Sequence, residues 1–270
     1  MRVAVVVVTV VVLGAFLSLV AAGSAQAPPP TVTVNVTESS LTVGATGALA
    51  AGPTRFEFVN ADDGAPEIAI AALRPGVTLA DASAALRSNP DSAIEMIHID
   101  GGATFGGPRR AVTMDLRPSS TYVAVNLSGD NPQEWEITPF STSDQSNGAS
   151  APQADARVRI FDLRFRGAKV LPRNGVVRFE NAGWAPHFAL AAPLRRGAKQ
   201  RRVARALRRN AQGQLERLLN FERSMEVQSL ITRGAVDYNE LRFPKRGRYV
   251  MVCFFEGHNT QGMYRFVRVR

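Results

Sequence analysis

The residues of this 270-residue sequence with the clearest chemical potential lie near its C-terminus. Cys253, His258 and Met263 follow one another at the spacing C-x4-H-x4-M, and a further histidine, His187, stands upstream behind Pro186. A thiolate, two imidazoles and a thioether form the soft donor set of a type 1 copper site. Cysteine with two histidines also suits zinc, but the thioether and the divalent affinity order favour copper. The spacing therefore predicts one copper ion per chain, bound by His187, Cys253, His258 and Met263.

Each of these residues also has a simpler role when taken alone. A single cysteine is commonly a small buried hydrophobe, and a methionine is commonly part of a core. His187 and His258 could each be turn residues. However, Cys253 is the one cysteine of the sequence, so it has no intrachain disulfide partner. A thiol outside the cell is oxidised unless it is buried or bound to metal. Taken together, the four residues favour a metal site.

The two halves of the sequence repeat a common pattern. Alternating β-rich runs open both halves, at 31–36 and 158–163. Strands that end in asparagine follow, at 55–60 and 177–181. A turn followed by a strand closes each half, at 116–126 and 241–253. A short helical insert is predicted in each copy. In the first, Thr78 and Asp81 form a capping box before an apolar run; in the second, Val203, Leu207 and Leu215 fall at helical spacing. The pattern predicts a mainly β protein with two tandem β-sandwiches.

Charge and composition place the boundary between the halves. Residues 28–150 hold six basic and fourteen acidic side chains, a net charge of −8, whereas residues 151–270 hold twenty-five and nine, a net charge of +16. The segment 141–155 is rich in Ser, Asn, Gly and Pro and is interpreted as a linker. We therefore expect a first domain at 28–140 and a second, copper-binding domain at 156–270.

In its ligand spacing the sequence resembles the cupredoxin superfamily, whose phytocyanin-like members share C-x4-H-x4-M. The resemblance implies Greek-key β-sandwiches of the cupredoxin type, one-electron transfer, and a C-terminal ligand, His258, more exposed than His187. Phe188 departs from the Asn or Ser that many members carry after the first ligand histidine, which puts the usual hydrogen bonding near the cysteine sulfur in question. In the first half Glu67 and Asn126 stand where His187 and Cys253 stand in the second. The first domain is therefore expected to be copper-free.

The N-terminus is typical of an export signal. A single basic residue, Arg2, precedes a long apolar run and the small residues Gly23 to Ala27. We expect a signal peptide at 1–27, although the apolar run is also long enough for a retained anchor. The protein is thus predicted to be exported from a bacterium, either secreted or attached to the cell envelope.

Basic residues crowd the helical insert of the second half. Eight arginines and lysines lie between Arg195 and Arg209. Such a surface attracts polyanions. We expect an acidic redox partner, an anionic cell-envelope polymer or the acidic first domain itself, whereas a solvated helix face is the simpler alternative. Nucleic acid is not expected, because no recognition motif accompanies the run.

The sequence supports three functions to different degrees. An exported electron carrier is favoured; a copper storage or delivery protein without redox turnover, and a structural cell-surface module with a vestigial site, are the alternatives. Copper oxidases and nitrite reductases need additional histidine ligands, and this chain has three histidines in all. On that ground the chain is predicted not to be an enzyme.

Overall fold

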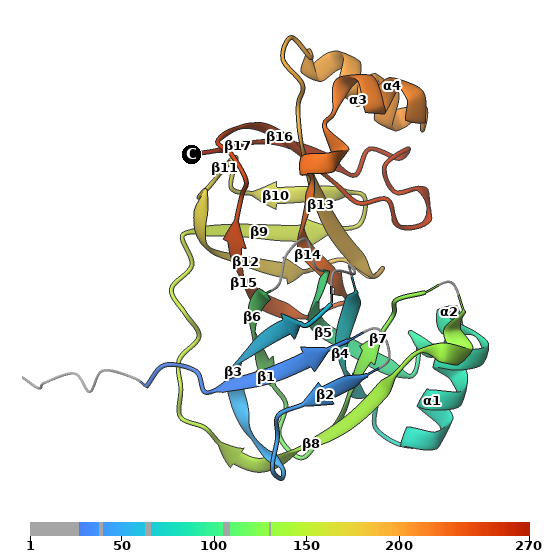
Figure 1. Cartoon of the computed structure of the whole chain (residues 1–270), viewed down its shortest axis with the longest axis vertical. Coiled ribbons are helices and arrows are strands. Elements are labelled where there is room, and N and C mark those ends of the chain that lie inside the picture. Colours follow the sequence, from blue (N-terminus) through green and yellow to red (C-terminus); the bar gives the residue numbers. More distant parts are fainter. Residues whose placement is uncertain (1–26, 38–39, 63–65, 105–108, 130) are drawn as a thin grey trace, which may run out of the picture.

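The computed structural model describes residues 27–37, 40–62, 66–104, 109–129 and 131–270. The predicted export signal lies outside them except for Ala27. Elements of the first half gather at one end of the molecule and those of the second half at the other (Figure 1). In this described part of the chain, no helix has the length and apolarity needed to cross a membrane.

The first half folds as two facing layers of strands. One layer has the order β2-β1-β3-β6 and the other β5-β4-β7-β8. Alternate side chains of each layer, such as Phe56, Phe58 and Ile70, are buried in one apolar core. The described elements are β1 (Thr31–Val36), β2 (Leu41–Val43), β3 (Leu49–Asn60), β4 (Glu67–Leu73), α1 (Leu79–Ser88), α2 (Pro90–Ala93), β5 (Ile97–Thr104), β6 (Arg109–Leu116), β7 (Thr121–Asn126), η1 (Pro132–Glu134) and β8 (Ile137–Ser146).

The second half repeats this arrangement. Its layers are β10-β9-β12-β15 and β11-β17-β16-β13-β14, around a core that includes Phe179, Tyr249 and Met251. The elements are β9 (Ala156–Phe161), β10 (Arg164–Gly167), β11 (Val170–Leu171), β12 (Asn174–Asn181), β13 (His187–Pro193), α3 (Gln200–Arg208), α4 (Gln212–Leu218), η2 (Phe221–Arg223), β14 (Met225–Ile231), β15 (Val236–Arg242), β16 (Gly247–Val252), η3 (Phe255–Gly257) and β17 (Tyr264–Val269).

Strand pairing confirms the predicted repeat and the mainly β fold class. In the first half β1 pairs in parallel with β3, β3 pairs with β6, β4 pairs with β5 and β7, and β7 pairs with β8. In the second half β9, β12, β15, β13, β14, β16 and β17 pair in the same pattern. The same order of elements along the chain thus produces the same sandwich twice, each with one helical insert.

The helical inserts cover the outer face of the second layer in each half. Helix α1 begins at the predicted capping box, where the Thr78 hydroxyl accepts a hydrogen bond from the Asp81 amide at 3.1 Å. Helices α3 and α4 bury Val203, Leu207 and Leu215 against the outward-facing residues of β16. Because strand side chains alternate between faces, β16 buries Val250 and Val252 under the helices, while Tyr249 and Met251 enter the sandwich.

The structure differs from two expectations, one about the linker and one about the basic helix. Strand β8 continues through Ser146, so the first six residues of the predicted linker 141–155 are β-structure; their backbone pairs with β7 and β3, and this pairing overrides the polar composition. Helix α3 lies at the end of the second domain remote from the first domain (Figure 1). The basic helix therefore does not dock on the acidic first domain in this structure.

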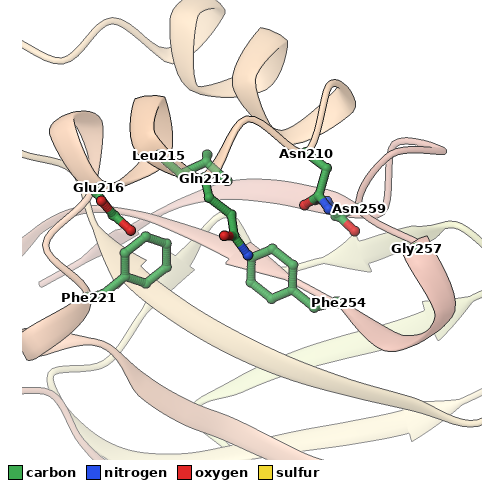
Figure 2. Close-up of a pocket in the computed structure, with 8 residues that line it drawn as sticks. All are labelled: Asn210, Gln212, Leu215, Glu216, Phe221, Phe254, Gly257 and Asn259. Carbon is green, nitrogen blue, oxygen red and sulfur yellow. Dashed lines mark hydrogen bonds between the residues drawn. The ribbon is translucent and has the colours of Figure 1, made fainter.

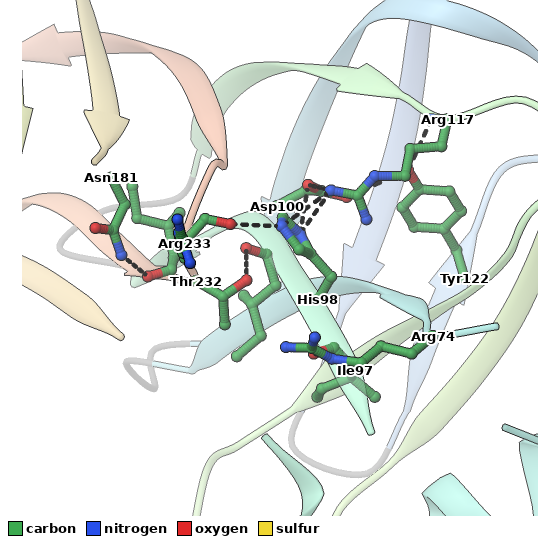
Figure 3. A network of polar contacts seen from close by, with 11 residues as sticks. Arg74, Ile97, His98, Asp100, Arg117, Tyr122, Asn181, Thr232 and Arg233 are labelled. Carbon is green, nitrogen blue, oxygen red and sulfur yellow. Dashed lines mark hydrogen bonds and ion pairs between the residues drawn. The ribbon is translucent and has the colours of Figure 1, made fainter. Parts of the chain in front are cut away.

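The two domains meet through a shared sheet and a network of polar contacts. Strand β15 of the second domain pairs antiparallel with β6 of the first. Beside this junction the His98 Nε2 donates to the carbonyl oxygen of Arg233 at 2.8 Å, and the Thr232 amide donates to the carbonyl oxygen of Ile99 at 3.0 Å (Figure 3). The β14–β15 turn is thus held in place by the first domain.

Asp237 is a fully buried carboxyl group at the junction. Its oxygens accept hydrogen bonds from Gln228 at 2.7 Å and from Asn239 at 3.0 Å, yet burial raises the pKa of Asp237 to about 7. Between about pH 4 and 7 the folded chain therefore holds a proton that the unfolded chain has released. Under those conditions the free energy of unfolding falls as the pH rises.

We predict that Asp237→Asn removes this dependence. The unfolding free energy of the variant, relative to the unchanged chain, should increase by about 1.4 kcal/mol per pH unit across that window. Denaturant unfolding at several pH values measures it, with Asp144→Asn, at an exposed aspartate of β8, as the control. Identical pH profiles for the unchanged chain and Asp237→Asn would show that Asp237 is ionised in the fold.

Candidate metal centre

The loop between β16 and β17 carries three of the predicted ligands. The Cys253 amide donates to the carbonyl oxygen of Met263 at 3.2 Å, and the Met263 amide donates to the carbonyl oxygen of His258 at 2.9 Å. Gly257 and Gly262 have φ values of +76° and +104°, which favour glycine and permit the two turns between these bonds. Backbone hydrogen bonds therefore fold the C-x4-H-x4-M segment back on itself.

The fourth predicted ligand comes from the neighbouring strand. His187 is the first residue of β13, which pairs antiparallel with β16. Ligand atoms of His187, Cys253 and His258 all lie within 4.8 Å of one another, and all three residues are buried. The Cys253 Sγ and the His258 Nδ1 are 3.6 Å apart, and the two imidazole centroids are 4.9 Å apart. The structure thus brings together three of the four residues in the geometry of a metal-binding group.

Met263 is fully buried in the core beside this group. Its backbone bonds to Cys253 and His258 place it on the ligand loop. Its role as the weak axial ligand stays a prediction from the sequence.

The two nitrogens of His187 have different surroundings. Its Nε2 lies 3.3 Å from an Asp162 carboxylate oxygen, whereas its Nδ1 is buried without a hydrogen-bond partner. Burial lowers the pKa of His187 to about 4, against the opposing effect of Asp162. A neutral imidazole whose Nε2 donates a hydrogen bond presents the Nδ1 lone pair. That orphaned atom fits a metal ligand.

The cysteine sulfur is held by backbone groups. Burial raises the pKa of the Cys253 thiol, and hydrogen bonds from the amides of Phe188 and Phe255 act in the opposite direction. Because a backbone amide supplies the bond at position 188, the phenylalanine found there does not remove it. The departure at Phe188 therefore leaves hydrogen bonding to the sulfur intact.

Asp162 is the functional residue that sequence reasoning missed. It lies in the two-residue turn between β9 and β10, and one of its oxygens also accepts hydrogen bonds from the amides of Trp184 and Ala185 at 2.8 and 3.1 Å. Burial would raise the pKa of Asp162, but these amides and His187 hold it below its ordinary value. Gly183 allows the close approach, since a Cβ there would lie 2.5 Å from the carboxylate. Asp162 thus orients both His187 and the loop before it.

The first domain lacks a comparable group among its described residues. Glu67 begins β4 as His187 begins β13, and Asn126 ends β7, where its side chain bonds to Ser128. His98 is engaged in the polar network at the domain junction. Within the described residues, His187, Cys253 and His258 form the single candidate metal group.

A pocket of about 500 Å³ opens between α4 and the ligand loop (Figure 2). Its walls combine two aromatic rings, Phe221 and Phe254, with amide and carboxylate groups of Gln212, Glu216 and Asn259. The Asn259 side-chain Nδ2 donates to the carbonyl oxygen of Leu207 at 3.1 Å. This bond ties the ligand loop to helix α3.

Comparisons with known proteins find structural likenesses alone. No family model and no curated protein matches the sequence. Among similar solved structures is auracyanin B, 22% identical, with 45% of this chain and 93% of that chain covered and a TM-score of 0.30. A multicopper oxidase is 14% identical, covering 89% of this chain and 88% of its own, at a TM-score of 0.27. The strand pairing and the ligand group remain the grounds for the cupredoxin resemblance.

The prediction that the chain is not an enzyme is wrong. Besides the oxidase, the similar structures include a copper nitrite reductase from Nitrosomonas europaea, 12% identical, covering 89% of this chain and 93% of its own, with a TM-score of 0.27. The prediction against an enzyme rested on the number of histidines in one chain. That count does not limit a site whose ligands come from two chains of a symmetric assembly.

We predict that Asp162→Asn weakens copper binding about 10- to 100-fold, because the carboxylate that contacts the His187 Nε2 and orients that ring is lost. The amide oxygen can still accept the two backbone bonds, so the loop should persist. Competition with a chromophoric Cu(I) chelator measures the affinity. Asp155→Asn is the matched control, since Asp155 accepts a bond from the Val176 amide at 2.8 Å without touching a ligand. Equal affinities for both variants would rule out a positioning role for Asp162.

Proposed function

We propose that this protein is an exported type 1 copper protein that carries single electrons. The observation that supports this most strongly is the convergence of His187, Cys253 and His258, with the Nδ1 of His187 left without a partner. Copper supplies a centre that alternates between Cu(I) and Cu(II). The export signal predicted from the sequence supports a location outside the cytoplasm.

The residues of the site have distinct roles in this proposal. Cys253 provides the thiolate, whose charge is offset in a dry core by the amides of Phe188 and Phe255. His187 and His258 bind through imidazole nitrogens, and Met263 provides the weak thioether. Asp162 fixes the ring of His187. Ligands that are buried and held by backbone bonds move little, which suits a site that changes charge without changing shape.

The apolar side chains around the donor atoms also suit an electron-carrying site. The donor atoms adjoin a core that includes Ala189, Met251 and Val267, and all three histidine and cysteine ligands are at most 7% exposed. Water therefore has little access to the sulfur or the metal position. A dry site of this kind sets the redox potential through burial and hydrogen bonding.

We predict one copper per chain and intense thiolate-to-copper absorption in the visible for the Cu(II) protein. Cys253→Ser should abolish the band, because the chain has no second thiol. His98→Ala is the matched control: it removes the histidine outside the site and should retain one copper and the band. Metal analysis measures the copper content per chain, and an absorption spectrum measures the thiolate-to-copper band. A colourless Cu(II) complex in the unchanged chain would contradict the proposal.

A further inference from the structure

An exposed apolar surface surrounds Asp162. Leu163 follows it in the hairpin turn and is 36% exposed, while Trp184, whose amide donates to the Asp162 carboxylate, is 75% exposed. Tryptophan is enriched at the energetic centres of protein interfaces. The two side chains therefore form the apolar centre of a candidate contact surface.

Arginines stand on the β9–β10 hairpin and on the β14–β15 turn, the two segments that adjoin this centre. Three of them, Arg159, Arg164 and Arg166, place their guanidinium groups 5.1 to 5.5 Å from the centre of the Phe161 ring. The guanidinium of Arg233, on the β14–β15 turn, lies 3.4 Å from the centre of the Trp184 ring. Arg159 pairs with Glu180, whereas no ion pair is recorded for the other three within the described residues. Asp162 and Glu180 set two carboxylates against these four guanidinium groups, so the surface carries a net positive charge.

The first domain helps to build this surface. The carbonyl oxygen of Arg233 accepts the hydrogen bond from His98, and the neighbouring Thr232 is bonded to Ile99 (Figure 3). These contacts fix the β14–β15 turn that presents the Arg233 side chain beside Trp184. The first domain thereby gains a role in ordering a feature of the second domain.

A hydrogen-bonded path joins this surface to the metal centre. The Asp162 side chain is 44% exposed and lies 3.3 Å from the Nε2 of the fully buried His187. His258 is more exposed than His187, as expected, but its exposed fraction is only 7%, against 0% for His187. The adjacent Asn259 is 2% exposed. The carboxylate at the surface end of this path is therefore far more accessible to a partner than the ring of His258.

We propose that Leu163, Trp184, Arg159, Arg164, Arg166 and Arg233, here named the Trp184 surface, dock an acidic redox protein that exchanges an electron through Asp162 and His187. The inference rests on the proposed function. One electron leaves the reduced partner, which is thereby oxidised, and reduces Cu(II) to Cu(I); no covalent bond changes. The partner would thus contact the chain on the His187 side of the metal centre and not at His258.

The composition of the surface favours a folded protein over a flexible polymer. A polyanionic polymer needs cations but gains nothing from an exposed tryptophan and leucine. A protein interface combines apolar anchors with a charged rim, and arginine and tryptophan are enriched in it. Electrostatic complementarity with an acidic partner also speeds association at low salt.

The test uses the two tryptophans of the chain, Trp135 and Trp184, whose indole N–H groups give separate NMR signals. The probe is oxidised plant-type [2Fe–2S] ferredoxin, an acidic one-electron protein, titrated into the ¹⁵N-labelled chain. We expect the Trp184 signal to shift or broaden while that of Trp135 does not. Binding should weaken as salt shortens the Debye length from about 30 Å at 0.01 M to about 8 Å at 0.15 M.

Paired charge variants give the control. Arg164→Gln with Arg166→Gln should weaken binding about fivefold or more, whereas Arg201→Gln with Arg205→Gln on α3, an equal loss of charge from exposed sites, should change it little. An unmoved Trp184 signal, or a larger effect of the α3 pair, overturns the proposal. Equally tight binding of poly-glutamate at Trp184 overturns it in favour of a polymer. The NMR result is the same without copper, so a missing charge-transfer band would refute the proposed function and not this surface.

Discussion

The buried Nδ1 of His187 is the constraint around which the candidate metal centre is arranged. A buried polar atom left without a hydrogen bond costs roughly 1–3 kcal/mol. Here the surrounding structure maintains that arrangement: Asp162 holds the opposite nitrogen, β13 fixes the backbone, and burial keeps the ring neutral. The thiol of Cys253 and the Nδ1 of His258 face the same place. A soft metal ion with open coordination positions satisfies all three donors at once.

The sheet that contains β13 and β16 brings the donor residues together, although they lie far apart along the chain. Pairing of the two strands sets His187 beside the end of β16, where Cys253 begins the ligand loop. The helical insert packs on the outer face of the same sheet, and the bond from Asn259 to Leu207 secures the loop from that side. The fold therefore supports the site from within the sandwich and from its outer surface.

The sequence was sufficient for the features that depend on local pattern. Alternating strands, the capping box at Thr78 and the spacing from Cys253 to Met263 all require only near neighbours along the chain. Asp162 could not be found in this way, because its contact with His187 spans twenty-five residues and depends on how a hairpin turn meets a loop. The pairing of β6 with β15 and the extension of β8 through Ser146 are likewise set by tertiary partners, which composition does not reveal. The prediction against an enzyme also depended on a count within one chain, and such a count does not cover ligands that a second chain would supply.

The most direct test of the central claim is X-ray absorption spectroscopy at the copper edge of the copper-loaded protein. The account predicts one short sulfur scatterer and two imidazole nitrogens in the unchanged chain. In His187→Ala it predicts one imidazole fewer, with the sulfur retained. A copper environment without sulfur, or one that is unaltered by His187→Ala, would contradict the assignment of His187, Cys253 and His258 as a single copper site.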